Sequence, residues 1–436
     1  MKKSPDRNIL LIAYYYPPLN TGGVDRAAKI AKLLPRFGHR VTVLTHSYRK
    51  SDRGDAQVIR VYDPSYSRDH RGLRRWQWLP LRLLTEGLNR IGIYFSILTL
   101  WKRAVLRHSQ RIIERVKPDL IMATYPPLET LEIALQLAQR YGLPLLADFR
   151  DGLLFEPVEK KRLEQLACLR RRFQITETQI AGRSDAITTV SPPISHYFQK
   201  KFRHPAVNTV SNGFDRDDFL NLPEPLGLER NAFNIVYTGS FALSEAGRSG
   251  DGLLKSLARL AEEKPKVSKK IRLHLIGHLR QNEVARLRNG PAGDRIVFHG
   301  IVDRPRALAF QKRADLLLLV TSPQSRSVAT GKLFEYLCAG PPILALTGPS
   351  TAARIVKETR TGWVVSPDRE KALFMLLKRL AANPSLLHSL KPDRKKIAAY
   401  SWIKQMAALD AIIRRIAAAG GAREAIPSGK HRRFDF

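Results

Sequence analysis

The sequence predicts an α/β protein of two doubly wound domains, and three observations support that prediction. Short apolar runs alternate with helical patterns along nearly all of the 436 residues, which is typical of βαβ units and parallel sheets. The alternation occurs in two comparable series, separated by a segment rich in proline and acidic residues at 215–231. An apolar content of 44% suffices for two sizeable cores. We therefore expect two Rossmann-like domains that face each other across a cleft, with ligands beyond the carboxyl ends of the strands.

The first βαβ unit shows the pattern most clearly. A strand at 8–13 leads into a loop rich in proline and glycine, and a helix follows. The apolar face of that helix consists of Ile30, Leu33, Leu34 and Phe37, spaced at the helical period. Gly38 ends it, and a strand at 41–44 comes next. Further strands of this series are expected at 119–123, 145–148, 186–190 and 207–210.

The second series defines the remaining domain boundaries. Its strands are expected at 234–238, 271–276, 295–298, 316–320, 343–346 and 363–365. The prediction assigns an N-terminal domain to 1–214, a linker to 215–231 and a C-terminal domain to 232–395. A helical region at 396–418 is expected to return to the N-terminal domain, and a basic tail at 419–436 is expected to be mobile.

The net charge of +35 requires an explanation. Such a field attracts nucleic acid or an anionic membrane face. A basic amphipathic insertion at about 66–117 holds much of the charge, and its tryptophans include Trp76, Trp78 and Trp101. Basic residues interleaved with Trp and Leu suit a headgroup interface, although an ordinary helical insertion with a solvated basic face fits equally well. Nucleic acid is disfavoured as a partner because no helix-turn-helix, zinc-finger or RNP signature occurs.

Cysteine usage indicates a cytoplasmic protein, and the basic insertion leads us to expect a peripheral position on the inner face of the membrane. The two cysteines, Cys168 and Cys338, lie in apolar helical contexts and are expected to be reduced core residues. No apolar run reaches the roughly 18 residues that a bilayer requires. The apolar run at 9–13 is a first strand rather than a signal peptide. His274, within an apolar strand, is expected to be a satisfied core residue.

The segment 329–344 is the most informative in the chain. A turn of small residues opens a short helix with an apolar face. Thr330 and Gly331, at the helix start, leave N–H groups at its positive end, where phosphate binds. Glu335, one turn further on, can accept bonds from sugar hydroxyls, whereas a pair with Lys332 within the helix is the alternative. Diphosphate at the helix start and ribose at a carboxylate describe a nucleotide-sugar site.

Two cations are candidates for stabilising a departing diphosphate. Arg248 lies in a glycine-containing loop after Gly239 and Ser240, which end the first strand of the second series. Lys332 lies at the phosphate-binding helix start. Two such positive groups would replace a divalent metal, so neither a metal nor another cofactor is expected. Solvated surface is the alternative for each cation.

Candidates on the acceptor side lie in the first series. Gly22 and Gly23 precede a helix, where glycine allows the backbone to approach a phosphate or sugar, although turn geometry alone explains the pair too. Arg26 can contact the same anion or be solvated. Arg150 and Asp151 follow a predicted strand, where charges require partners. We expect Asp151 to face the cleft; a pair between Arg150 and a neighbouring aspartate is the alternative.

With these residues in view, the chain resembles the glycosyltransferases of family 4, the retaining group with the GT-B fold. The order and spacing of many short segments make the resemblance specific. These segments are 16–18, 22–26, 38–41, 147–151, 190–192, 210–219, 236–239, 275–277, 299–300, 314–318 and 331–344. Among them, Gly277 and Gly300 join the donor-side candidates.

The resemblance implies a nucleotide-sugar donor held mainly by the C-terminal domain, retention of anomeric configuration and no metal. The family's second motif glutamate, which binds ribose, falls on Glu335, and the first falls on Ser327. The arginine that usually follows the strand-end glycine is missing because Ser240 stands there, so Arg248 is the candidate substitute.

The resemblance also implies an activity and an acceptor. The subgroup with Gly-Lys-x-x-Glu-Tyr is associated with surface polysaccharide assembly, which implies a glycan or lipid-linked glycan acceptor. A departing diphosphate oxygen can take the acceptor's proton, so no separate general base is expected. A catalytically impaired binding protein on the same fold would fit Ser327, and a nucleic-acid binder would fit the charge.

Overall fold

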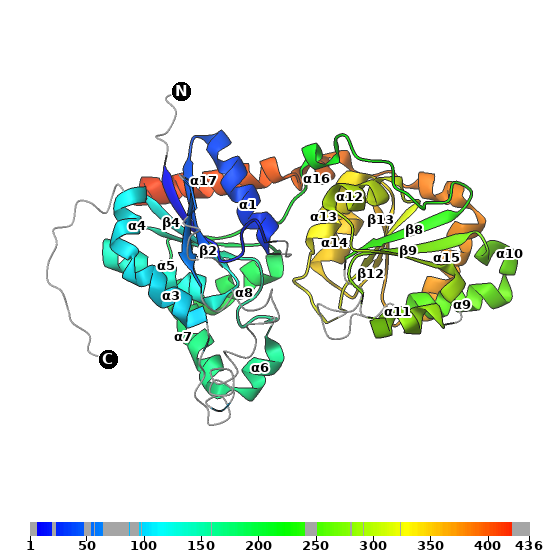
Figure 1. Ribbon diagram of the computed structural model, residues 1–436, viewed down its shortest axis with the longest axis horizontal. Helices are drawn as coiled ribbons and strands as arrows, with labels where there is room; N and C mark the ends of the chain where they lie inside the picture. The colour runs from blue at the N-terminus through cyan, green and yellow to red at the C-terminus, as the bar shows by residue number, and fades with distance from the viewer. Residues whose placement is uncertain are drawn as a thin grey trace. The chain divides into compact units, whose positions relative to one another are not determined.

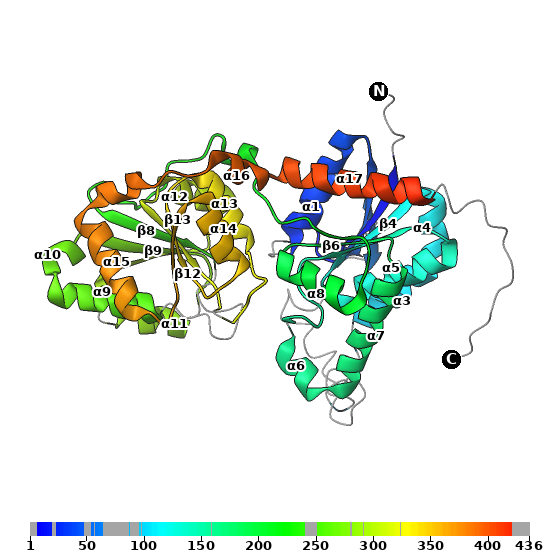
Figure 2. The same ribbon diagram turned by 180° about the vertical axis from the view of Figure 1, so that it is seen from behind.

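The computed structural model describes residues 7–19, 23–47, 54–55, 57–63, 87, 96, 98–157, 159–239, 251–279, 281–290, 292–322 and 324–420. These residues form two compact units, shown from opposite sides in Figures 1 and 2. The first unit contains the described residues up to 190, together with 194–210 and those from 406 onward. The second contains 191–193 and 211–405.

A parallel sheet of seven strands forms the centre of the first unit, in the order β3-β2-β1-β4-β5-β6-β7. The strands are β1 Asn8–Ile12, β2 Arg40–Ser47, β3 Val58–Tyr62, β4 Leu120–Tyr125, β5 Leu145–Phe149, β6 Ala186–Thr189 and β7 Val207–Thr209. In β1, Ile9 lies opposite Val41 on one side and Leu120 on the other. The strand order reverses between β1 and β4, and ligands of doubly wound sheets bind at such a switch point.

Helices cover both faces of this sheet, which explains why its central strands β1, β4 and β5 are mostly apolar. They are α1 Val24–Leu33, α3 Leu98–Arg107, α4 Ser109–Val116, α5 Leu128–Tyr141, α6 Lys160–Gln165, α7 Ala167–Arg183, α8 Pro192–Phe202 and α17 Trp402–Gly420. The first unit includes α17 from Met406 onward. His39 contacts Asp410 of this helix, with 2.7 Å between Nε2 and Oδ1. The C-terminal helix therefore returns to the N-terminal unit.

The second unit has a parallel sheet of six strands with the same type of topology, β10-β9-β8-β11-β12-β13. Its strands are β8 Phe233–Thr238, β9 Ile271–Ile276, β10 Ile296–Gly300, β11 Leu316–Val320, β12 Ile343–Leu346 and β13 Gly362–Val365. In β8, Ile235 lies opposite Leu273 of β9 and Leu316 of β11. The switch point of this sheet lies between β8 and β11.

Alternate residues of the second sheet pack on different sets of helices. The helices are α9 Asp251–Glu263, α10 Pro265–Ser268, α11 Gln281–Arg288, α12 Arg304–Arg313, α13 Gly331–Ala339, α14 Thr351–Thr359, α15 Glu370–Ala382 and α16 Arg394–Ala399. Ile235 and Tyr237 share a core with α9 and α15, whereas Val236 shares a core with α12, α13 and α14. Figure 1 shows α13 and α14 on one side of the sheet and α9 and α15 on the other. This alternation of period two is that of a strand buried on both faces.

Every strand expected from the sequence is present, and the two doubly wound sheets confirm the predicted fold class. One strand was not predicted. β3, Val58–Tyr62, lies at the edge of its sheet, and only its first two residues are buried. Its apolar pattern is therefore short and interrupted by Arg60. Such a pattern does not indicate a strand in the sequence.

The described part of the basic insertion is α3, α4 and the residues around them. Trp101 is fully buried, with its ring 5.0 Å from that of Tyr14 in an edge contact. This corrects the expectation that Trp101 is available to lipid headgroups. Trp76 and Trp78 lie outside the described residues, as does the tail from residue 421. None of the described helices combines the length and apolarity needed to cross a bilayer.

Cys168 and Cys338 are free thiols and half-buried rather than core residues, which corrects part of their prediction. His274 is fully buried and satisfied, as expected. Its Nε2 lies 2.9 Å from Asn234 Oδ1, and its Nδ1 lies 3.0 Å from His299 Nε2.

Candidate functional site

Three neighbouring strands of the second sheet end in glycines with positive φ. The angles are 109° at Gly239, 135° at Gly277 and 66° at Gly300. Backbone hydrogen bonds connect the strand ends: Gly239 N donates to Ile276 O, and Gly277 N donates to Gly300 O, each at 2.7 Å. A Cβ at Gly277 would lie 2.7 Å from the Gly239 carbonyl oxygen. This edge therefore requires glycine, and it presents backbone rather than side chains.

The start of α13 has an unsatisfied hydroxyl. Thr330 is the N-cap residue in an extended conformation, and its side chain does not cap the helix. Its Oγ1 is buried without a hydrogen-bond partner among the residues that the structure describes. A buried hydroxyl without a partner costs free energy, so a ligand oxygen would relieve it. Together with the helix N–H groups, this hydroxyl suits an anion.

Lys332 is fixed beside the end of β8. Its Nζ donates to the hydroxyl of Tyr237 at 3.0 Å and lies 4.1 Å from the centre of that ring. A Cβ at Gly239 would lie 2.8 Å from the same Nζ. Tyr237 is fully buried. Lys332 is therefore not a freely solvated surface lysine, and its charge lies at the carboxyl edge of the sheet.

The carboxylate of Glu335 lies between two donors. Gln311 Nε2 donates to Oε2 at 3.0 Å, and Arg304 Nη2 lies 3.1 Å from Oε1. The side chain retains 21% of its exposure, so a ligand can reach it. Glu335 is thus oriented by its neighbours without being enclosed.

Tyr336 joins α13 to the centre of the sheet. Its hydroxyl accepts from Thr238 N and donates to Leu318 O, both at 3.2 Å. Burial raises the pKa of this phenol, so it remains protonated and able to donate. Because Thr238 ends β8 and Leu318 lies in β11, Tyr336 positions the helix at the switch point.

A buried ion pair lies under the carboxyl edge of the first sheet. Asp148 Oδ1 accepts from Arg26 Nη2 at 2.6 Å and from Thr188 at 2.7 Å, and Oδ2 accepts from Arg26 Nε at 2.8 Å and from Thr124 at 2.9 Å. Burial alone raises the pKa of Asp148, but Arg26 and the two hydroxyls outweigh it and lower the pKa. Arg26 is 3% exposed. This corrects the expectation that Arg26 is solvated or contacts an acceptor.

Arg150 connects three loop carbonyls. Its guanidinium donates to Pro126 O at 2.7 Å, to Tyr125 O at 3.3 Å and to Gly23 O. A side chain at Gly23 would collide with this guanidinium. Arg150 therefore connects the end of β4 and the loop after it to the residue before α1 through backbone contacts, and its place on the acceptor side stays a prediction. Asp151, next to it, is half-buried, and its charge partly offsets the lowering of the Arg150 pKa by burial.

The remaining predicted site residues divide into two groups. Ser327 is 7% exposed in the loop that precedes α13. Gly22, Ser240 and Arg248 lie outside the described residues, so their roles stay predictions. In the described part of the chain, no group of three or more His, Cys, Asp or Glu side chains is arranged to hold a metal.

Arg304 and Gln311 were missed by the sequence analysis. A signal for Gln311 was present. It follows Leu308, Ala309 and Phe310 on a helix, and all four are buried. A glutamine three residues after Leu308 shares its helix face, so it needed a polar partner.

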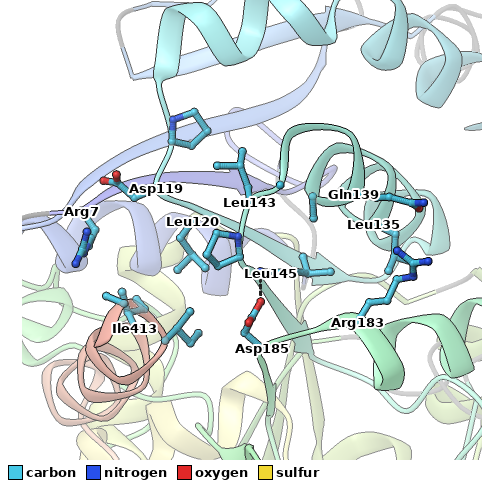
Figure 3. Close-up of a pocket in the computed structure, with 16 residues that line it drawn as sticks. Arg7, Asp119, Leu120, Leu135, Gln139, Leu143, Leu145, Arg183, Asp185 and Ile413 are labelled. Carbon is cyan, nitrogen blue, oxygen red and sulfur yellow. Dashed lines mark hydrogen bonds between the residues drawn. The ribbon is translucent and has the colours of Figure 1, made fainter. Parts of the chain in front are cut away.

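A cavity of about 760 Å³ lies at the opposite edge of the first sheet. Figure 3 shows the residues that line it. Its lining includes Asp119, Leu145 and Asp185, which lie at the amino ends of β4, β5 and β6. Asp185 Oδ2 accepts from Leu145 N at 2.9 Å. Because doubly wound sheets bind ligands at their carboxyl edges, this cavity is not the candidate site.

Comparisons with known proteins agree with this geometry. The family described as Glycosyl transferase 4-like domain matches residues 21–213, and the family described as Glycosyl transferases group 1 matches residues 232–383. Between them, the two matches span most of the chain. No curated protein matches the sequence.

Solved structures with a similar fold cover almost the whole chain. Sucrose-phosphate synthase from Thermosynechococcus elongatus is 17% identical with a TM-score of 0.66, covering 94% of this chain and 99% of its own. Anabaena HepE in complex with UDP is 15% identical with a TM-score of 0.56, covering 96% and 100%. The lipopolysaccharide outer core galactosyltransferase WaaB is 14% identical with a TM-score of 0.57, covering 93% and 99%.

The glycine-lined edge, the α13 helix start and the accessible Glu335 thus occur on the fold of these enzymes and within the matched group 1 domain. The chain is therefore a glycosyltransferase that uses a nucleotide-sugar, with a Glycosyl transferase 4-like domain followed by a Glycosyl transferases group 1 domain.

Proposed function

We propose that this enzyme transfers a sugar from a nucleoside diphosphate to a hydroxyl of a glycan or lipid-linked glycan during surface polysaccharide assembly. The observation that carries the proposal is the start of α13. There, the hydroxyl of Thr330 is unsatisfied at the helix start, and the accessible Glu335 follows by three residues the Lys332 whose ammonium is fixed. Phosphate oxygens need donors and ribose hydroxyls need an acceptor, and this helix offers both.

On the donor side, Glu335 holds the ribose, and Thr330, Gly331 and Lys332 hold the diphosphate. Gly239, Gly277 and Gly300 leave room for the donor along the strand ends, and Ser327 and Ser240 complete the donor side. HepE has been solved with UDP and with UDP-glucose, which makes UDP the first nucleotide to test.

During transfer, the bond between the anomeric carbon and the diphosphate oxygen breaks, and a bond to the acceptor oxygen forms with retained configuration. Negative charge develops on the departing diphosphate, where Lys332 and Arg248 stabilise it. The departing oxygen takes the acceptor's proton. No divalent metal is required in this scheme, because two cations and a helix start neutralise the diphosphate.

On the acceptor side, the loop of Gly22 and Gly23 and the carboxylate of Asp151 line the sugar acceptor. Arg150 supports this proposal because it fixes the carbonyl of Gly23 and lies next to Asp151 in the chain. WaaB, a lipopolysaccharide galactosyltransferase, supports a glycan acceptor.

We also propose that the enzyme works as a peripheral protein on an anionic, cytoplasmic membrane face. The support is a set of exposed cations on α3, α4 and the residue after α4: Arg103, Arg107, Arg111, Arg115 and Lys117. Each such cation near an anionic surface contributes about 1 kcal/mol. Co-sedimentation with vesicles of graded phosphatidylserine content tests this. Binding that rises with anionic lipid supports it, and binding indifferent to lipid charge contradicts it.

Turnover tests the function itself. The purified chain is incubated with glycan acceptors and a panel of nucleotide-sugars that differ in base and sugar, and release of the nucleoside diphosphate is measured with and without acceptor. Acceptor-dependent release that Glu335→Ala abolishes supports the proposal. Release without transfer, or none from any nucleotide-sugar, contradicts it.

A further inference from the structure

We propose that Gln311 is a positioning residue that orients the Glu335 carboxylate toward the hydroxyls of the donor ribose. This inference rests on the proposed function, because it explains how the same site would prefer a donor with ribose hydroxyls over one without them. It concerns Gln311 of α12, which belongs neither to the start of α13 nor to the three strand-end glycines.

Gln311 connects the strand end to the carboxylate. Its Nε2 lies 3.1 Å from Thr238 Oγ1 and 3.0 Å from Glu335 Oε2. An amide nitrogen has two hydrogens, and this geometry directs one to each oxygen. Thr238 is the last residue of β8 and lies opposite Ile276 of β9 in the sheet. The amide therefore sets the distance between Glu335 and the end of β8.

Burial distinguishes Gln311 from Arg304, which also contacts Glu335. Gln311 is 1% exposed, whereas the side chain of Arg304 is 49% exposed and also contacts Asp218 at 3.2 Å. Exposed ion pairs exchange readily with water and contribute little. A buried hydrogen bond to a charged group is stronger and holds its geometry. Gln311 is thus the contact that fixes the orientation of the carboxylate.

The carbonyl oxygen of the Gln311 amide also indicates that a glutamine is present here for function rather than for folding. Gln311 Oε1 is buried without a partner among the described residues. An unpaired buried acceptor is destabilising, so a nonpolar side chain of similar length would serve folding better. The contact to Glu335 explains why a glutamine occupies the position.

The test compares two ligands that differ only in the ribose. UDP and 2′,3′-dideoxy-UDP are titrated calorimetrically into the full chain and into Gln311→Met, which preserves length but donates nothing. We expect the wild type to prefer UDP, and Gln311→Met to lose about tenfold in UDP affinity, the scale of one hydrogen bond to a charged group. Affinity for the dideoxy ligand should change little, so the ratio of the UDP affinity to the dideoxy-UDP affinity falls toward one.

Tyr336→Phe is the matched control. It removes another buried hydrogen bond to Thr238, but the Tyr336 hydroxyl bonds to Thr238 and Leu318 rather than to Glu335. A general loosening of this cluster would weaken both ligands together and leave their ratio unchanged. A lowered ratio in Gln311→Met but not in Tyr336→Phe supports positioning of the carboxylate.

Gln311→Glu provides a second variant. Ionised, it repels Glu335; protonated, it regains a donor. The UDP preference should therefore be lost at neutral pH and recover as the solution is acidified.

An unchanged preference in Gln311→Met, when Glu335→Ala abolishes it, overturns this inference and leaves the proposed function intact. Absence of binding by any nucleoside diphosphate to the wild type overturns both. If Gln311→Met does not fold, Gln311→Glu is the variant that tests the inference. In that variant, a preference for UDP over the dideoxy ligand that does not change with pH overturns the inference.

Discussion

The ammonium of Lys332 lies 3.0 Å from the hydroxyl of Tyr237 and 4.1 Å from the centre of its ring. This contact fixes a positive charge where β8 ends, because Tyr237 belongs to that strand and is fully buried. A lysine has four rotatable bonds, and the ring and hydroxyl restrict them. The charge is therefore in place before a diphosphate arrives.

Tyr237→Phe should weaken UDP binding about threefold to tenfold, because Lys332 keeps its ring contact but loses the hydroxyl that orients it. Calorimetric titration with UDP and with uridine measures the effect. Uridine affinity should not change, since uridine lacks the diphosphate. Tyr336→Phe is the control for loss of a buried hydroxyl. Equal losses for UDP and uridine would contradict the assignment of Lys332 to the diphosphate.

Thr330→Val should leave the free energy of unfolding unchanged or slightly higher, because the Thr330 hydroxyl is buried without a partner in the described chain. The same change should weaken UDP binding about fivefold to tenfold by removing a donor to phosphate. Urea unfolding without ligand and titration with UDP separate the two effects. Loss of stability with unchanged UDP affinity would make Thr330 a structural residue.

Asp148→Asn should destabilise the first unit by about 3–5 kcal/mol, because it leaves the buried guanidinium of Arg26 without a counter-charge. The pKa of Asp148 is lowered in the folded state, so its contribution is present above the ordinary carboxyl pKa and is lost as pH falls through the lowered value. Urea unfolding at neutral pH measures the loss. A loss below 1 kcal/mol would show that the pair contributes little.

His274 should make the second unit sensitive to acid. Burial, with a smaller contribution from His299, lowers the pKa of His274 to about 4. The unfolded chain therefore binds a proton near pH 6.5 that the folded chain refuses, and stability falls as pH drops from 6.5 toward 4. His274→Gln should reduce the loss between pH 7 and pH 5 by about 1–2 kcal/mol. Parallel pH profiles for the two proteins would contradict this.

The two doubly wound sheets were predictable because buried parallel strands are almost continuously apolar. The sequence Leu-Leu-Leu-Leu-Val at 316–320 is such a strand, and Gly38 ends the first helical region in a left-handed conformation, as expected. The edge strand β3 was missed because too few of its residues are buried to give a continuous apolar run.

The candidate site was predictable only where its residues are neighbours in the sequence. Thr330 is the N-cap of α13, and Lys332 and Glu335, three residues apart in its first turns, share one face of the helix. The partners of Glu335, in contrast, come from α12, and the partner of Arg26 comes from β5. Contacts between distant segments leave no local pattern, which is why Arg26 was predicted to contact an anion on the acceptor side, with solvation as the alternative.

The most direct measurement is calorimetric titration of UDP into the wild type and into Glu335→Ala, with thermal unfolding of both proteins recorded without ligand. We predict measurable binding to the wild type, at least a tenfold weaker affinity in the variant, and unchanged unfolding temperatures. Equal affinity of the two proteins for UDP would contradict the assignment of Glu335 to the ribose.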